Sequence, residues 1–219
     1  MADIKLELRL ITTGAEITRA ILERCRDEVN RRLMTDTMRS EIRQMTQCIL
    51  QEAIMNQPEY ESLMSGVLKT ELGLEDSGKV QSIINVWLKG VDVKLYPATI
   101  VGSKIIGDII LTAIPSDYSD VLGSNAASYT AAKGATIPWL SWLLLQGDNI
   151  IIATHKAVYD PNRAQHSRTG HDIMLPSDEG WRVPPEFSGT VDNNFVTRAV
   201  ASALPELRYQ LESKLRSKL

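Results

Sequence analysis

The sequence predicts an α+β fold in which long N-terminal helices pack on a small antiparallel sheet, with extended loops and a C-terminal helix. Three observations support this fold class. Apolar residues recur every four positions near both ends of the chain, which is typical of amphipathic helices. Apolar and polar residues alternate in the middle of the chain, as they do in half-buried strands. The helical and strand-like segments do not alternate regularly, which favours α+β over a doubly wound parallel sheet.

A short strand and two helices are predicted at the N-terminus. Aliphatic and charged residues alternate over 4–10, which is the period of a half-buried strand. A spacing of four between apolar residues over 15–33 predicts a helix, and a similar pattern over 38–53 predicts a second one. Thr35 or Asp36 could cap the second helix, unless the two helices continue as one. The apolar positions of the first helix are Ile17, Ile21, Cys25, Val29 and Leu33.

The middle of the chain predicts a helix followed by an antiparallel hairpin. Residues 80–88 have a compact amphipathic pattern that Gly90 closes. The period then changes to two over 91–95, and a second, more apolar strand follows over 105–114. The intervening turn at 97–103 suggests that the two strands pair as a hairpin.

Three further elements are predicted toward the C-terminus. A short apolar helix occupies 138–147, and a strand follows over 150–159. The last helix begins near Asp192 or Asn193, either of which is a good N-cap. Pro205 is expected to kink or restart this helix, because proline lacks the backbone N–H that the helix needs.

Bulk properties bound the class of protein. We expect residues 1–219 to form a single domain from which two long loops, 115–135 and 160–190, protrude. The formal net charge of −3 makes blanket attraction to nucleic acid or to anionic membranes unfavourable. The most apolar window, 137–145, is about half as long as a membrane span. These properties predict a soluble protein that is made in the cytoplasm and does not contact a membrane.

The cysteines and two of the tryptophans are interpreted as core residues. Cys25 and Cys48 are too few for a disulfide framework in a chain of 219 residues, which favours a reducing compartment. Both fall in predicted helices, where free cysteine usually behaves as a small buried hydrophobic residue. Trp139 and Trp142 lie three positions apart on the predicted 138–147 helix, and we expect them to pack in the core.

No arrangement suited to catalysis stands out. The chain lacks a Gly-x-Ser-x-Gly elbow and a phosphate-binding loop, and neither cysteine lies beside an obvious base in the sequence. Two of the three histidines, His166 and His171, fall in a predicted loop, and only His155 lies on a predicted strand. Their spacing is not that of metal ligands. We therefore expect no enzymatic activity, no metal and no cofactor.

The segment 166–200 carries the candidate interface residues. Large aromatic and arginine side chains on long loops are typical of the anchors of protein interfaces. The alternative for Trp181 is that it fixes its loop onto its own domain, and residue types alone do not decide between the two. The candidate interface residues are Arg168, Trp181, Arg182, Phe187 and Arg198.

Several motifs between residues 56 and 200 resemble proteins encoded in the structural modules of tailed bacteriophages. The chain is similar to their neck proteins, in the head–tail joining and tail-completion families. The motifs are Pro58-Glu59-Tyr60-Glu61-Ser62-Leu63, Glu71-Leu72-Gly73, Lys133-Gly134, Ile137-Pro138-Trp139-Leu140, Ser167-Arg168-Thr169-Gly170 and Trp181-Arg182-Val183-Pro184-Pro185-Glu186-Phe187.

The resemblance implies a structural protein that forms a six- or twelvefold ring in the virion neck and joins the DNA-filled head to the tail, as a tail-completion, connector or terminator protein. Its partners would be further copies of itself, the neighbouring portal-side and tail-side virion proteins, and DNA passing through the lumen. In that family a Pro-Phe segment leads into the last helix, and this chain departs from the pattern by inserting 188–192. The alternatives are an assembly factor absent from the mature particle and a small particle-associated hydrolase.

Ring contacts are heterologous, so one patch meets a different patch on the next copy. The apolar helix faces and the loop with Trp181 and Phe187 are therefore expected to be buried against neighbours. On this hypothesis, Trp181→Ala abolishes head–tail joining and leaves the single chain folded.

Overall fold

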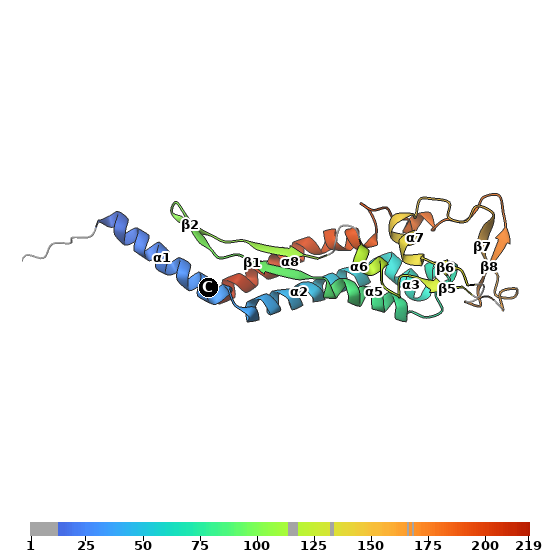
Figure 1. Ribbon diagram of the computed structural model, residues 1–219, viewed down its shortest axis with the longest axis horizontal. Coiled ribbons are helices and arrows are strands. Elements are labelled where there is room, and N and C mark those ends of the chain that lie inside the picture. The colour runs from blue at the N-terminus through green and yellow to red at the C-terminus, as the bar shows by residue number, and fades with distance from the viewer. Residues whose placement is uncertain (1–12, 114–117, 132–133, 166, 168) are drawn as a thin grey trace, which may run out of the picture.

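The computed structural model describes residues 13–113, 118–131, 134–165, 167 and 169–219. The molecule is elongated, with two long helices side by side along its middle, a projecting helix and hairpin tip at one end, and the short helices and strands at the other (Figure 1). The α+β class with a C-terminal helix is confirmed. The predicted strand at 4–10 lies outside the described residues.

Two separate helices form the N-terminal region. Helix α1 spans Gly14–Leu33 and helix α2 spans Asp36–Met55. Thr13 caps α1 through a reciprocal capping box with Glu16. The Thr35 hydroxyl accepts a hydrogen bond of 3.1 Å from the backbone N–H of Met38, which starts α2 anew. The alternative of one continuous helix is therefore excluded.

Helix α8, Phe195–Lys218, packs along α2 (Figure 1). Leu50 of α2 and Ala203 and Leu207 of α8 share a buried cluster with Val91. Helix α8 runs through Pro205 without a break, so the predicted restart at this residue was wrong. Proline has no N–H to donate, so the Ala201 carbonyl loses its helical partner. Both Pro205 and Ala201 are exposed, so water can satisfy that carbonyl.

The predicted hairpin is present and is longer than its sequence pattern indicated. Strand β1 (Asp92–Leu95) pairs with β4 (Ile109–Thr112), and β2 (Thr99–Val101) pairs with β3 (Lys104–Ile106). The strands therefore extend into the predicted 97–103 turn, and the chain reverses at Gly102, whose φ of +62° favours glycine. We call α1 and this hairpin the arm.

The opposite end of the molecule, which we call the body, holds the main core. It comprises the described residues of 58–89 and 118–187 with the first turns of α8. Its elements are α3 (Pro58–Ser65), α4 (Val67–Glu71), α5 (Gly78–Lys89), α6 (Ser119–Leu122), β5 (Tyr129–Thr130), β6 (Thr136–Ile137), α7 (Trp139–Leu145), β7 (His155–Tyr159), β8 (Asp172–Pro176) and the 3-10 turn η1 (Pro185–Phe187). Trp139 is fully buried and Trp142 packs against the same cluster, so their predicted core role is confirmed.

The loops 115–135 and 160–190 contain more regular structure than the sequence predicted. The first includes α6 and β5, and the second includes β8 and η1. Strand β8 pairs with β7 from His155↔Pro176 to Tyr159↔Asp172. The predicted strand at 150–159 begins only at His155, because Ile152 makes an isolated bridge to Trp181 instead of joining that ladder.

Both cysteines are exposed, which corrects their interpretation as buried residues. Cys25 lies on α1, none of whose residues is buried, and Cys48 lies on α2. The predicted helices are correct, but the body does not cover these faces. Within the part of the chain that the structure describes, no helix is both long and apolar enough to cross a membrane.

Candidate functional site

Trp181 belongs to the core of its own chain. Its side chain is only 6% exposed, and its ring lies 5.7 Å from that of Trp142. The indole Nε1–H donates a hydrogen bond of 2.9 Å to the Glu71 carboxylate. Its backbone exchanges hydrogen bonds with Ile152. The alternative that Trp181 fixes its loop onto its own domain is therefore the one that the structure supports, and its use as an exposed interface anchor was wrong.

The other candidate interface residues before the last helix differ in exposure where the structure describes them. Phe187 is half-buried against the same core, and Arg182, next to Trp181 in the sequence, is exposed. Arg168 lies outside the described residues. Arg182 alone of these three has an exposed side chain that the structure describes.

Arg198 neutralises a buried carboxylate. Its guanidinium forms an ion pair with Glu59, whose side chain is 1% exposed, and donates a hydrogen bond of 2.8 Å to the Asn193 side chain. The second Glu59 oxygen has no hydrogen-bond partner among the described residues. An unpaired buried carboxylate is strongly unfavourable, so the contact with Arg198 ties α8 to α3. The sequence offered no signal for this pairing, because the partners are 139 positions apart.

Glu71 is the titratable residue that contacts the Trp181 side chain. Burial raises the pKa of Glu71, the hydrogen bond from Trp181 opposes that shift, and the charges of Asp172 and Glu186 add to it. His155 shares a hydrogen bond with Thr154, and the ring of His171 stacks on Tyr159. In the described ranges, no group of three or more His, Cys, Asp or Glu side chains could hold a metal ion.

The arm leaves large apolar side chains exposed. Ile17 is 39% exposed and Ile21 is 58% exposed on α1. Val101, Ile106 and Ile110 of the hairpin are also exposed. Surface ion pairs such as Arg19–Glu23 and Arg31–Glu28 support the helix along its length. The arm is therefore a regular structure that has more apolar surface than its own chain covers.

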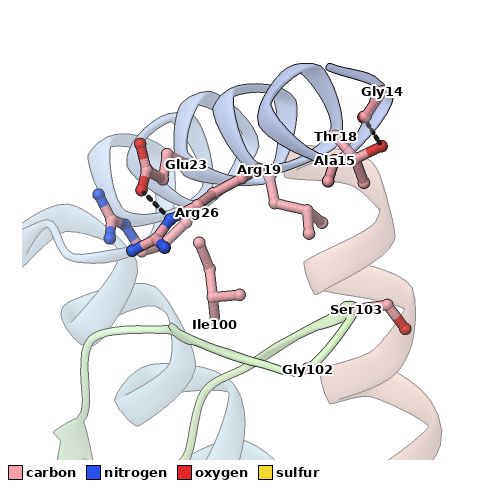
Figure 2. A pocket seen from close by; sticks show the side chains of 10 residues that line it. Gly14, Ala15, Thr18, Arg19, Glu23, Arg26, Ile100, Gly102 and Ser103 are labelled. Carbon is pink, nitrogen blue, oxygen red and sulfur yellow. Dashed lines mark hydrogen bonds and ion pairs between the residues drawn. The ribbon is translucent and has the colours of Figure 1, made fainter.

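The arm is fixed in place by a reciprocal pair of hydrogen bonds. The Asn30 side chain of α1 donates a hydrogen bond of 3.1 Å to the Ala98 carbonyl of the hairpin. It also accepts a hydrogen bond of 2.7 Å from the Ala98 N–H. Beyond this clamp, α1 and the hairpin tip enclose an open groove of about 690 Å³, toward which Ile100 points (Figure 2). The groove is lined by Gly14, Ala15, Thr18, Arg19, Leu22, Glu23, Arg26, Ile100, Gly102 and Ser103.

A second groove of about 800 Å³ runs between α2 and α8. Half-buried apolar side chains of α2 line it, together with two carboxylates and no cationic side chain. We call it the α2/α8 groove. Its lining residues are Met45, Cys48, Ile49, Glu52, Ala53, Asn56, Gln57, Ser202, Ala203, Glu206 and Gln210.

Compared with protein-family models, with curated protein sequences and with solved structures, the chain shows no significant match to any of them.

Proposed function

We propose that the protein is a structural subunit that assembles into a ring in the neck of a tailed-bacteriophage particle and helps to join the head to the tail. The exposed apolar surface of the projecting arm is the observation that carries this proposal. Residue motifs similar to those of phage neck proteins support the location.

The arm supports self-assembly because its apolar surface is organised. A helix of 20 residues extends about 30 Å, which is long enough to reach well into a neighbouring subunit. Ile17 and Ile21 repeat along one side of that helix, as in helices that bind in a groove. In a ring, such a helix of one copy meets a different surface of the next copy.

The opposite end of the molecule supplies a second exposed surface. Tyr159 on the β7–β8 hairpin is 70% exposed, and Ile150 is also exposed. An elongated subunit with apolar residues exposed at both ends suits a protein that contacts its own copies and the virion proteins on either side.

Counting copies of the protein in purified particles tests this proposal. Quantitative mass spectrometry with isotope-labelled standard peptides gives its amount relative to the portal protein, and the major head protein serves as the internal control. A ratio near one half or near one supports a six- or twelvefold neck ring. Absence from finished particles would overturn the neck proposal and favour an assembly factor or an enzyme.

A further inference from the structure

We infer that helix α1 of one copy docks into the α2/α8 groove of a second copy of this chain. The inference rests on the proposed ring, because it names the contact through which neighbouring copies would meet. It is nevertheless testable on the purified protein, without reference to the virion.

The groove has the chemistry of a receptor for an apolar, basic helix. Met45, Ile49 and Ala53 present half-buried side chains along one wall. Glu52 and Glu206 are both exposed on its lining, and neither forms an ion pair with a described residue. The groove therefore combines apolar contact surface with two carboxylates that have no cationic partner among the described residues.

Helix α1 carries the complementary pattern. Ile17, Ile21 and Cys25 follow each other at intervals of four and are all exposed. Arg24 lies seven residues after Ile17, almost two helical turns, so it projects from the same side of the helix as the apolar residues. Arg24 is exposed and makes no ion pair within the described part of the chain. Docking would bring this cation and the groove carboxylates together as the apolar side chains lose contact with water.

The dimensions of the two partners agree. The α2 wall of the groove extends from Met45 to Ala53, about 12 Å along the helix, and α1 is longer than that. Apolar residues repeated every four positions form the ridge that packs into the groove of another helix at a crossing angle of about −50°. The exposed stripe of α1 has this spacing.

The α1 of the same chain is held elsewhere and cannot fill the groove. The α1 that docks there therefore belongs to a second copy. Asn30 clamps α1 to Ala98 of the hairpin, and Arg32 donates to the backbone carbonyls of Lys218 and Leu219 at the end of α8. The α2/α8 groove is instead lined by the middle of α8 and the second half of α2. Helix α1 projects away from this pair of helices (Figure 1). Because the two surfaces differ, the contact is heterologous and can close into a ring.

The two native cysteines provide a direct test. Cys25 lies in the exposed stripe of α1, and Cys48 lines the groove. Cys48→Ser retains only the α1 thiol, and Cys25→Ser retains only the groove thiol. Each variant is treated with a short bis-maleimide alone, and an equimolar mixture of the two is treated in parallel. Link formation within a single chain is impossible in every sample.

We expect a crosslinked dimer from the mixture and none above background from either variant alone. Adding Arg24→Glu to the Cys48→Ser chain should lower the dimer yield roughly fivefold, and Glu52→Lys in the Cys25→Ser chain should restore much of it. A mixture that crosslinks no better than its components would overturn the inference. A dimer from the Cys48→Ser variant alone would also overturn it, because α1 would then pair with another α1.

These outcomes are separate from those of the copy count. If the protein is present at a ring stoichiometry in particles but the mixture does not crosslink, the docking contact is wrong and the neck proposal stands. If the mixture crosslinks but particles lack the protein, the contact stands and the neck proposal fails.

Discussion

The arm and the Trp181 loop offer an instructive comparison. Both carry large side chains of the kinds enriched at protein interfaces, and the sequence favoured the loop as the docking surface. In the structure Trp181 is buried among Glu71, Trp142 and Ile152, whereas Ile17 and Ile21 of α1 remain exposed. Residue type alone therefore does not identify an interface, because the same side chains also fill cores.

The difference has a topological cause. The Trp181 loop returns to the body, where α4 and α7 supply partners on two sides. Helix α1 contacts the hairpin and one end of α8, and its last residue Leu33 packs against the start of α2. None of its own residues is buried. The variants below test this contrast, beginning with the largest expected effect.

Trp181→Ala should unfold at a much lower denaturant concentration than the wild type. Removing a buried tryptophan leaves a cavity and releases the Glu71 hydrogen bond, and we expect a loss of about 3–5 kcal/mol in the free energy of unfolding. Urea denaturation followed by circular dichroism measures it. The neighbouring exposed Arg182→Ala serves as the control, with a change within about 0.5 kcal/mol. Equal stability of the two variants would mean that Trp181 does not stabilise its own chain, and it would again be a candidate interface residue.

Arg198→Ala should lower the free energy of unfolding by about 3 kcal/mol, because it leaves the buried Glu59 carboxylate without its cation. The matched control is Arg208→Ala, an exposed arginine on the same helix, for which we expect little change. Combining Arg198→Met with Glu59→Gln should recover part of the loss in the same denaturation assay. If Arg198→Ala behaves like Arg208→Ala, the ion pair does not stabilise the junction of α3 and α8.

Thr35→Ala should cost about 1 kcal/mol, because the N–H of Met38 loses its capping acceptor at the junction of α1 and α2. Thr35→Ser keeps the hydroxyl and should remain close to the wild type in thermal and urea unfolding. Equal losses for the two variants would show that the hydroxyl does not cap α2.

Glu71→Gln should have the smallest effect, and that effect should depend on pH. Burial raises the pKa of Glu71, so the folded state favours the protonated form. The stability that this preference contributes is fully present below the ordinary value of 4.5 and is lost as the pH rises through the raised value. Glutamine mimics the protonated form, so the variant should be the more stable protein at pH 7.

A pH series of urea unfolding curves measures this effect. The stability difference between Glu71→Gln and the wild type should shrink as the pH falls below 4.5. A difference that is constant from neutral to acidic pH would mean that ionisation of Glu71 is not its cause.

Local patterns predicted the helices and the hairpin well because these elements depend on periodicity within a short segment. The repeat of Ile17, Ile21 and Cys25 correctly indicated a helix, and the alternation around Val93 correctly indicated a strand. Strand β8 was missed because its pairing with β7 spans a connection of 12 residues that has no simple repeat. Pro205 was misjudged because its exposure depends on which side of α8 faces α2.

The candidate surfaces were harder to predict because exposure is a property of the whole fold. The period of four on α1 indicated an apolar stripe, but nothing local indicated that the body would leave Cys25 uncovered. The partners of Trp181 and Arg198, Glu71 and Glu59, lie 110 and 139 positions away in the chain. The assignment to a phage neck stays a prediction that depends on similarity of motifs.

The most direct test of the contrast between arm and body is to measure self-association and stability together for Ile21→Asp. Sedimentation velocity gives the oligomeric state, and urea unfolding gives the stability of the same sample, with Ile21→Leu as the matched apolar control. We expect the wild type and Ile21→Leu to self-associate at high concentration, and Ile21→Asp to remain monomeric with an unfolding free energy within about 0.5 kcal/mol of the wild type. Undiminished self-association of Ile21→Asp, or a wild type that stays monomeric, would contradict the assignment of α1 as the surface that joins one copy to the next.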